Sequence, residues 1–64
     1  MSALRTARER AGMSQEQAAS AIGKEQTEIS RWERGRHKPS PETLIRLADL
    51  YQCSIDALLG RKEI

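Results

Sequence analysis

Four polar residues that can hydrogen-bond to nucleobases lie within one short segment of the chain. In residues 26–34 the apolar residues Ile29 and Trp32 are three positions apart, so a helix there would leave its other face polar. In the DNA major groove, glutamine pairs with adenine, arginine pairs with guanine, and the threonine methyl contacts the thymine methyl. The candidates for base contacts are therefore Gln26, Thr27, Ser30 and Arg31. The alternative is that these four are ordinary solvated surface residues.

Basic residues flank this segment and suit contacts with phosphates, which fix the register of a protein on DNA. Lys24 precedes the segment, and Arg36, His37 and Lys38 follow it. Each one alone could be a solvated residue, but together they favour contact with a polyanion. Gln15 is a further phosphate candidate because it lies in the first turn of a predicted helix, where N–H groups and the helix dipole attract anions.

Length and composition exclude several other kinds of site. The 64 residues suffice for one small domain, residues 1–64, with a thin core and no large enclosed active site. His37 is the single histidine and Cys53 the single cysteine, which argues against a metal site, a catalytic triad or an internal disulfide. We therefore expect no enzyme activity, no cofactor and no small-molecule ligand.

The charge and hydropathy patterns point the same way. The net charge is +2, and the basic excess lies in the first two thirds of the chain, whereas residues 41–60 are acidic. No apolar run of about 18 residues and no apolar signal segment is present, so we expect no membrane span and a cytoplasmic location.

The hydrophobic spacing predicts five short helices and no strand. Ser14 and Gln17 form a capping-box pattern, and Ser40 precedes a proline at a first helical position, Pro41. The predicted helices cover about residues 2–11, 15–22 and 26–34, a fourth helix from Pro41 that includes Tyr51, and a fifth between Ser54 and Gly60.

Helices this short are unstable alone, so they must pack around a shared core. The predicted core residues are Leu4, Met13, Ala18, Ile22, Ile29, Trp32, Leu44, Leu47, Ala48, Ile55, Leu58 and Leu59.

Residues 14–35 have the spacing of a helix-turn-helix. Two predicted helices are joined by three residues that begin with Gly23, and such turns set the helices at about 90–120°. Ala18 and Ala19 would let the two helices approach closely, and Gly23 tolerates a positive φ in the turn.

Four motifs, in order, resemble the phage-repressor and Cro-type helix-turn-helix family, also called the XRE type. Residues 14–19 resemble its second helix, and residues 29–35 resemble its third helix with the end of that helix. Residues 38–44 and 54–60 resemble the start of its fourth helix and its fifth helix. The similarity extends over residues 4–60, nearly the whole chain.

The resemblance implies an all-α, five-helix, lambda-repressor-like domain whose third helix enters the DNA major groove. It implies base contacts at Gln26, Thr27 and Arg31 and a phosphate contact at Gln15. For Ser30 two alternatives stay open: contact with a base, or a hydrogen bond from its hydroxyl to a carbonyl of the preceding turn.

The resemblance also implies a structural, partly buried ion pair between Arg8 and Glu33. The sequence departs from the family at Glu25, where serine or threonine is usual, and glutamate is a poor N-cap. Glu25 and Glu28 could repel phosphates or accept from a cytosine amino group, and Glu28 could simply face solvent.

These features predict a sequence-specific, double-stranded DNA-binding transcriptional regulator, a repressor-like protein of bacterial or phage origin. One small module contacts too little DNA for high specificity, so we expect a homodimer on a palindromic operator. The alternatives are an antitoxin or a restriction–modification controller with the same domain, or a protein–protein interaction module. We predict a dimer interface at the junction of the fourth and fifth helices and in the tail. It contains Tyr51, Cys53 and Ile64, and Ile55 and Leu58 are further candidates that also fit the core.

Overall fold

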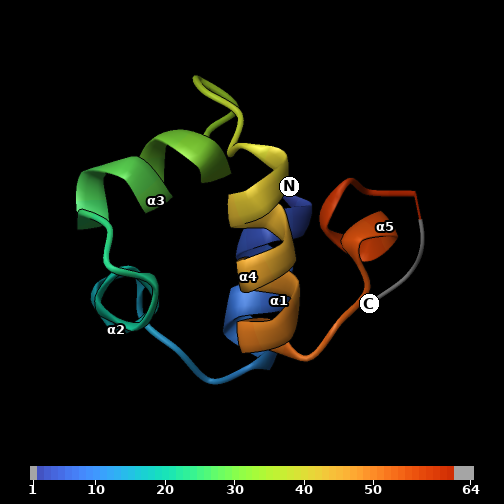
Figure 1. The fold of residues 1–64 in the computed structure, drawn as a ribbon, viewed down its shortest axis with the longest axis horizontal. Helices are drawn as coiled ribbons and strands as arrows, with labels where there is room; N and C mark the ends of the chain where they lie inside the picture. The colour runs from blue at the N-terminus through green and yellow to red at the C-terminus, as the bar shows by residue number, and fades with distance from the viewer. Residues whose placement is uncertain (1, 62–64) are drawn as a thin grey trace.

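The computed structural model describes residues 2–61, which form five helices and no strand (Figure 1). The all-α, five-helix fold predicted from the sequence is therefore confirmed. In chain order the helices are α1 (Ala3–Arg10), α2 (Gln15–Ile22), α3 (Gln26–Glu33), α4 (Pro41–Tyr51) and α5 (Ile55–Leu58).

Serine side chains start four of these helices. The hydroxyls of Ser2, Ser14, Ser40 and Ser54 each accept a hydrogen bond from the backbone N–H three residues later. Ser14 forms a complete capping box because its own N–H donates to Gln17 Oε1 at 2.9 Å. A cap of this kind stabilises a helix by about 1 kcal/mol, so these serines locate the helix starts.

Four helix boundaries, in three helices, differ slightly from the prediction. Ser2 and Ala11 flank α1 as caps, Arg34 caps the end of α3, and Leu59 caps the end of α5. Hydrophobic spacing locates the body of a helix but not its last residue, because a cap residue is only half helical.

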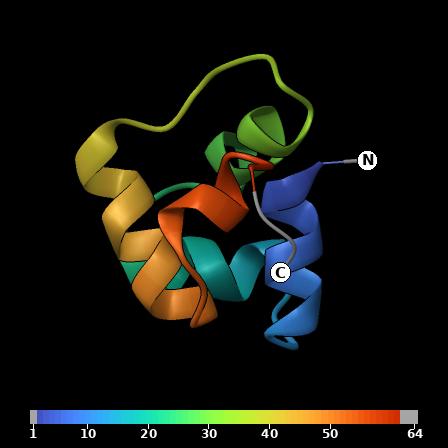
Figure 2. The same cartoon turned by 90° about the vertical axis from the view of Figure 1, so that its right-hand side faces the viewer.

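The core lies where α1, α2, α3 and α4 meet, and α5 adds Leu58 to it. Ala18, Ile29 and Leu47 are at most 2% exposed, and Ile22, Ala48 and Leu58 are also buried, as predicted. Leu4, Met13, Trp32 and Leu44 are partly buried and pack against this core. Figure 2 shows α5 beside α4, with the connection from α3 to α4 arching over one end of the molecule.

Two predicted core residues are exposed: Ile55 is 38% and Leu59 is 50% accessible to solvent. Since α5 is a single turn, only one side of it can face α1 and α4, and that side carries Ala57 and Leu58. The spacing of Ile55, Leu58 and Leu59 fits one helix face, but the docking of α5 determines which residues of that turn are buried.

Tyr51, predicted in the dimer interface, is 6% exposed and belongs to the core, so it is not available to a partner. Cys53 is half-buried against the core, and this burial raises the pKa of its thiol above the usual range. Ile64 lies outside the described residues.

Candidate nucleic-acid interface

Helices α2 and α3 pack directly against each other across the turn at residues 23–25. Gly23 has φ 67°, in the left-handed region that favours glycine, and the Lys24 N–H donates to the Ala19 carbonyl at 2.9 Å. Ala18 and Ala19 are 0% and 2% exposed, so small side chains lie where the helices approach. The turn and this contact hold α3 at a defined angle to α2.

The face of α3 turned away from the core carries the residues predicted to contact bases. Gln26, Thr27 and Arg31 are exposed, while Ser30 is half-buried. Ile29, between them in sequence, is 2% exposed and anchors the opposite face of α3 in the core. The four polar side chains therefore lie on one rigid helix rather than on a loop.

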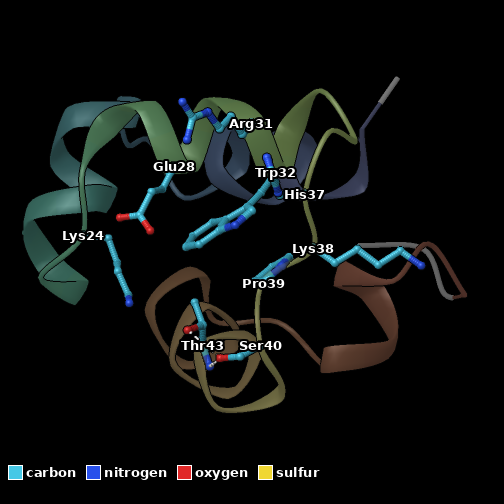
Figure 3. A pocket seen from close by; sticks show the side chains of 9 residues that line it. All are labelled: Lys24, Glu28, Arg31, Trp32, His37, Lys38, Pro39, Ser40 and Thr43. Atoms are coloured by element: carbon cyan, nitrogen blue, oxygen red, sulfur yellow. Dashed lines mark hydrogen bonds between the residues drawn. The ribbon is translucent and has the colours of Figure 1, made fainter.

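The residues Lys24, Arg36, His37 and Lys38, predicted to contact phosphates, are all exposed, the first just before α3 and the others in the connection after it. A hollow of about 310 Å³ lies between α3, the connection that follows it and the start of α4 (Figure 3). The indole of Trp32 projects into this hollow (Figure 3), and Arg31 is one of the residues that line it. The charged residues lining the hollow are three cations, Lys24, Arg31 and Lys38, and one anion, Glu28.

Glu28 helps to start α3 in place of a serine or threonine cap. Its Oε2 accepts from the Glu25 N–H at 3.1 Å, and its side chain lies on the hollow side of α3 (Figure 3). Glu28 is half-buried, so the interpretation of it as a plain solvent-facing residue is incomplete. This bond satisfies one of the N–H groups left without a partner at a helix start.

The ion pair implied by the resemblance is present and buried. Arg8 Nε and Nη2 donate to Glu33 Oε2 and Oε1 at 2.7 and 3.1 Å, and Arg8 Nη1 donates to the Met13 carbonyl at 2.8 Å. The two side chains are only 10% and 5% exposed. The hydrogen bond to Glu33 raises the pKa of Arg8 above its usual value, so the guanidinium stays charged.

The ion pair continues into a hydrogen-bond chain that reaches α3. Gln15 Nε2 donates to Glu33 Oε1 at 3.1 Å, and Gln26 Nε2 donates to Gln15 Oε1 at 3.3 Å. Sequence reasoning missed both bonds, because they join residues 18 and 11 positions apart and depend on how the helices pack. Gln15, predicted as a phosphate contact, is thus also tied to the buried ion pair.

Tyr51 is buried close to this ion pair, and burial raises the pKa of its phenol to about 12. The negative charge of Glu33 also raises this pKa, whereas the positive charge of Arg8 lowers it. The buried neutral phenol therefore stabilises the fold fully below pH 10, its ordinary pKa, and this contribution is lost as the pH rises towards 12.

We accordingly expect Tyr51, the one tyrosine, to ionise with a midpoint near pH 12 when absorbance at 295 nm is followed. Helical circular dichroism should fall over the same pH range. Between pH 10 and 12, the Tyr51→Phe variant should lose less folding stability than the wild type. A midpoint near pH 10 with full helicity would contradict this prediction.

Within residues 2–61, no helix combines the length and apolarity that crossing a bilayer requires. Across the same part of the chain, histidine, cysteine, aspartate and glutamate side chains do not gather into a group of three that could hold a metal ion.

Comparison with known proteins places this geometry in context. The profile of a family described as helix-turn-helix matches residues 4–58. The HTH-type transcriptional regulator ImmR of Bacillus subtilis (strain 168) is 38% identical over 61 residues, which make up 95% of this chain and 48% of that regulator. The chain therefore spans about half the length of the curated relative it matches.

Proposed function

Because the chain belongs to the helix-turn-helix family, we propose that it binds double-stranded DNA in a sequence-specific way and regulates transcription. The observation that carries this proposal is the exposed polar face of α3, anchored by the buried Ile29 and flanked by cations. A helix of this kind fits the major groove, and its N-terminal residues reach the base edges.

In this proposal the residues of α3 read bases and the residues around it hold phosphates. Side chains near the start of α3 reach furthest into the groove, and exposed cations at its two ends meet the flanking backbone. The base-contacting residues are Gln26, Thr27, Ser30 and Arg31, and the phosphate-contacting residues are Gln15, Lys24, Arg36, His37 and Lys38.

Selection from random duplex DNA at physiological salt tests this function. We expect a recurring sequence to be enriched, and its affinity to fall with salt by about 0.9 log units per log unit of salt for each phosphate neutralised. The absence of both an enriched sequence and a salt dependence would contradict DNA binding and favour the protein-interaction alternative.

We further propose that the chain is the single DNA-binding domain of a repressor that acts as a homodimer on a palindromic operator, with half-sites about 34 Å apart. Support for dimerisation comes from large apolar residues left exposed on two adjoining helices: Ile45 on α4 is 52% exposed, and Ile55 on α5 is 38% exposed. These residues replace the buried Tyr51 as the candidate contacts.

Ile55→Glu should therefore weaken self-association about tenfold or more, because a two-fold interface would bury the new carboxylate on both sides. Light scattering after size exclusion, with and without the selected palindrome, would measure this. Ala21→Glu, which places the same charge on the exposed side of α2, is the control and should assemble like the wild type. Equal assembly of both variants would remove α5 from the interface.

A further inference from the structure

We infer that a second cavity, an apolar groove between the connection from α3 to α4 and helix α5, binds a small anion with an apolar body, such as a fatty or aromatic carboxylate. This connection arches over one end of the molecule (Figure 2). The hollow described above lies on its Lys24 side, and the groove lies on its α5 side. The inference replaces the expectation, drawn from composition, of no small-molecule ligand. It goes beyond the proposed function, and only the effect of the ligand on DNA rests on that function.

The walls of the groove are apolar and come from separate parts of the chain. The apolar residues that line it are Leu4, Trp32, Pro39, Leu44, Leu58 and Leu59. Its volume is about 330 Å³, which lies in the range of about 300–1,000 Å³ that is typical of small-molecule sites. A docked amphipathic helix would need a groove several turns long for its repeated anchors, so this volume favours a small ligand.

The protein itself leaves these walls partly uncovered. Leu59 is 50% exposed, and the other apolar residues of the walls are half-buried, except for Leu58, which is 4% exposed. Removing such apolar surface from water is favourable, and exposed apolar patches of this kind mark binding sites. The apolar body of a ligand would supply the cover that the fold does not.

The polar groups at the groove select a negative charge on the ligand. Lys38 and His37 line the groove and are exposed, and within residues 2–61 no aspartate or glutamate side chain lines it. Lys38 forms no ion pair with any residue in that range. Its side chain extends away from Lys24, towards the side where α5 lies (Figure 3). An ammonium and an imidazole N–H both donate to a carboxylate, whereas a cationic ligand would be repelled by Lys38.

The ligand and DNA compete for the same side chains, because Lys38 and His37 are also among the proposed phosphate contacts. A carboxylate held by Lys38 removes one cation from the surface that meets the phosphates, and each such contact contributes to affinity. Coupling between two ligands is reciprocal, so DNA lowers the affinity for the anion by the same factor. Binding of the anion therefore favours release of the protein from DNA.

Titration of the full chain with octanoate tests the site. Trp32 is the one tryptophan and lines the groove, so its fluorescence reports binding, and shifts of backbone amide signals in NMR spectra locate it. We expect saturable changes at the groove residues with unchanged helical circular dichroism. Octyltrimethylammonium and 1-octanol carry the same apolar chain and should bind about tenfold more weakly or less, because they lack the charge-assisted bond.

Two pairs of variants provide matched controls. Leu59→Glu and Ile45→Glu place the same charge at positions that are 50% and 52% exposed, but only Leu59 lines the groove. Leu59→Glu should weaken octanoate binding about tenfold or more, and Ile45→Glu should leave it unchanged. Lys38→Gln should abolish the preference for octanoate over 1-octanol, whereas Lys24→Gln, which removes a lysine of the hollow, should preserve it.

The competition is tested with the duplex obtained by selection. Saturating octanoate should lower the affinity for that duplex roughly three- to tenfold and reduce its salt dependence by about 0.9 log units per log unit of salt. The Lys38→Gln variant should show neither effect.

Several results would overturn the inference. Equal binding of octanoate and octyltrimethylammonium, or equal losses in Leu59→Glu and Ile45→Glu, would reduce the contact to a general apolar one and exclude an anion site. Octanoate binding with an unchanged affinity for DNA would exclude the competition. If no duplex is bound, the proposed function and the competition fail together, and the octanoate titration alone decides the site.

Discussion

Arg8→Ala should destabilise the domain by about 3–5 kcal/mol, because it leaves Glu33 as an unpaired carboxylate in a buried place. The Glu33 side chain is only 5% exposed and would lose both of its bonds to the guanidinium. At about 0.05–0.15 kcal/mol per residue, a domain of this size has a total stability of only several kcal/mol. We therefore expect a substantial unfolded fraction at 25 °C, measurable by circular dichroism during thermal and urea unfolding.

The matched control is Arg5→Ala on the same helix. Arg5 pairs with Glu9 at 3.2 Å, but the two side chains are 60% and 53% exposed, so its loss should cost about 0.5 kcal/mol or less. The double variant Arg8→Met with Glu33→Leu should recover part of the stability, because neither charge is left buried. A melting curve of Arg8→Ala equal to that of Arg5→Ala would contradict a structural role for the ion pair.

Arg31→Ala should relax specificity at one base pair of the operator by about 1–3 kcal/mol, which is roughly 5- to 150-fold in relative affinity. Arg31 is exposed on α3 (Figure 3), on the face that we propose meets DNA. Because the side chain is exposed, folding stability should change by about 0.5 kcal/mol or less. Titration of fluorescent duplexes, each with one base pair changed, measures the effect.

The pattern across those duplexes decides the role of Arg31. A loss confined to one base pair makes it a base-reading residue, whereas an equal loss at every position and a shallower salt dependence make it a phosphate contact. Arg46→Ala removes the same charge from an exposed position of α4 and should leave both the affinity and the base preferences unchanged.

Local features were the ones that could be predicted from the sequence. The serine caps at Ser14 and Ser40, and the turn at Gly23 between two short helices, depend on neighbours within about four residues. Such bonds form wherever the residues occur in that order, so helix positions and the helix-turn-helix spacing followed from them. The polar face of α3 followed from the same periodicity.

Tertiary packing decided which residues are buried at the C-terminal end. The periodicity of α5 cannot show that Ala57 and Leu58 face inward while Ile55 and Leu59 face solvent, because a single turn has no second repeat to fix its phase. The same packing places Tyr51 in the core, which moved the candidate dimer contacts to other residues.

The sequence by itself determined that a short helix with a polar face would follow a glycine turn and carry side chains of the types that can hydrogen-bond to bases. Only the tertiary structure decided what lies behind that helix: a buried carboxylate, Glu33, that joins Arg8 to Gln15 and through it to Gln26. The physical reason is that a carboxylate removed from water must find donors wherever the fold brings them, and these donors come from distant parts of the chain.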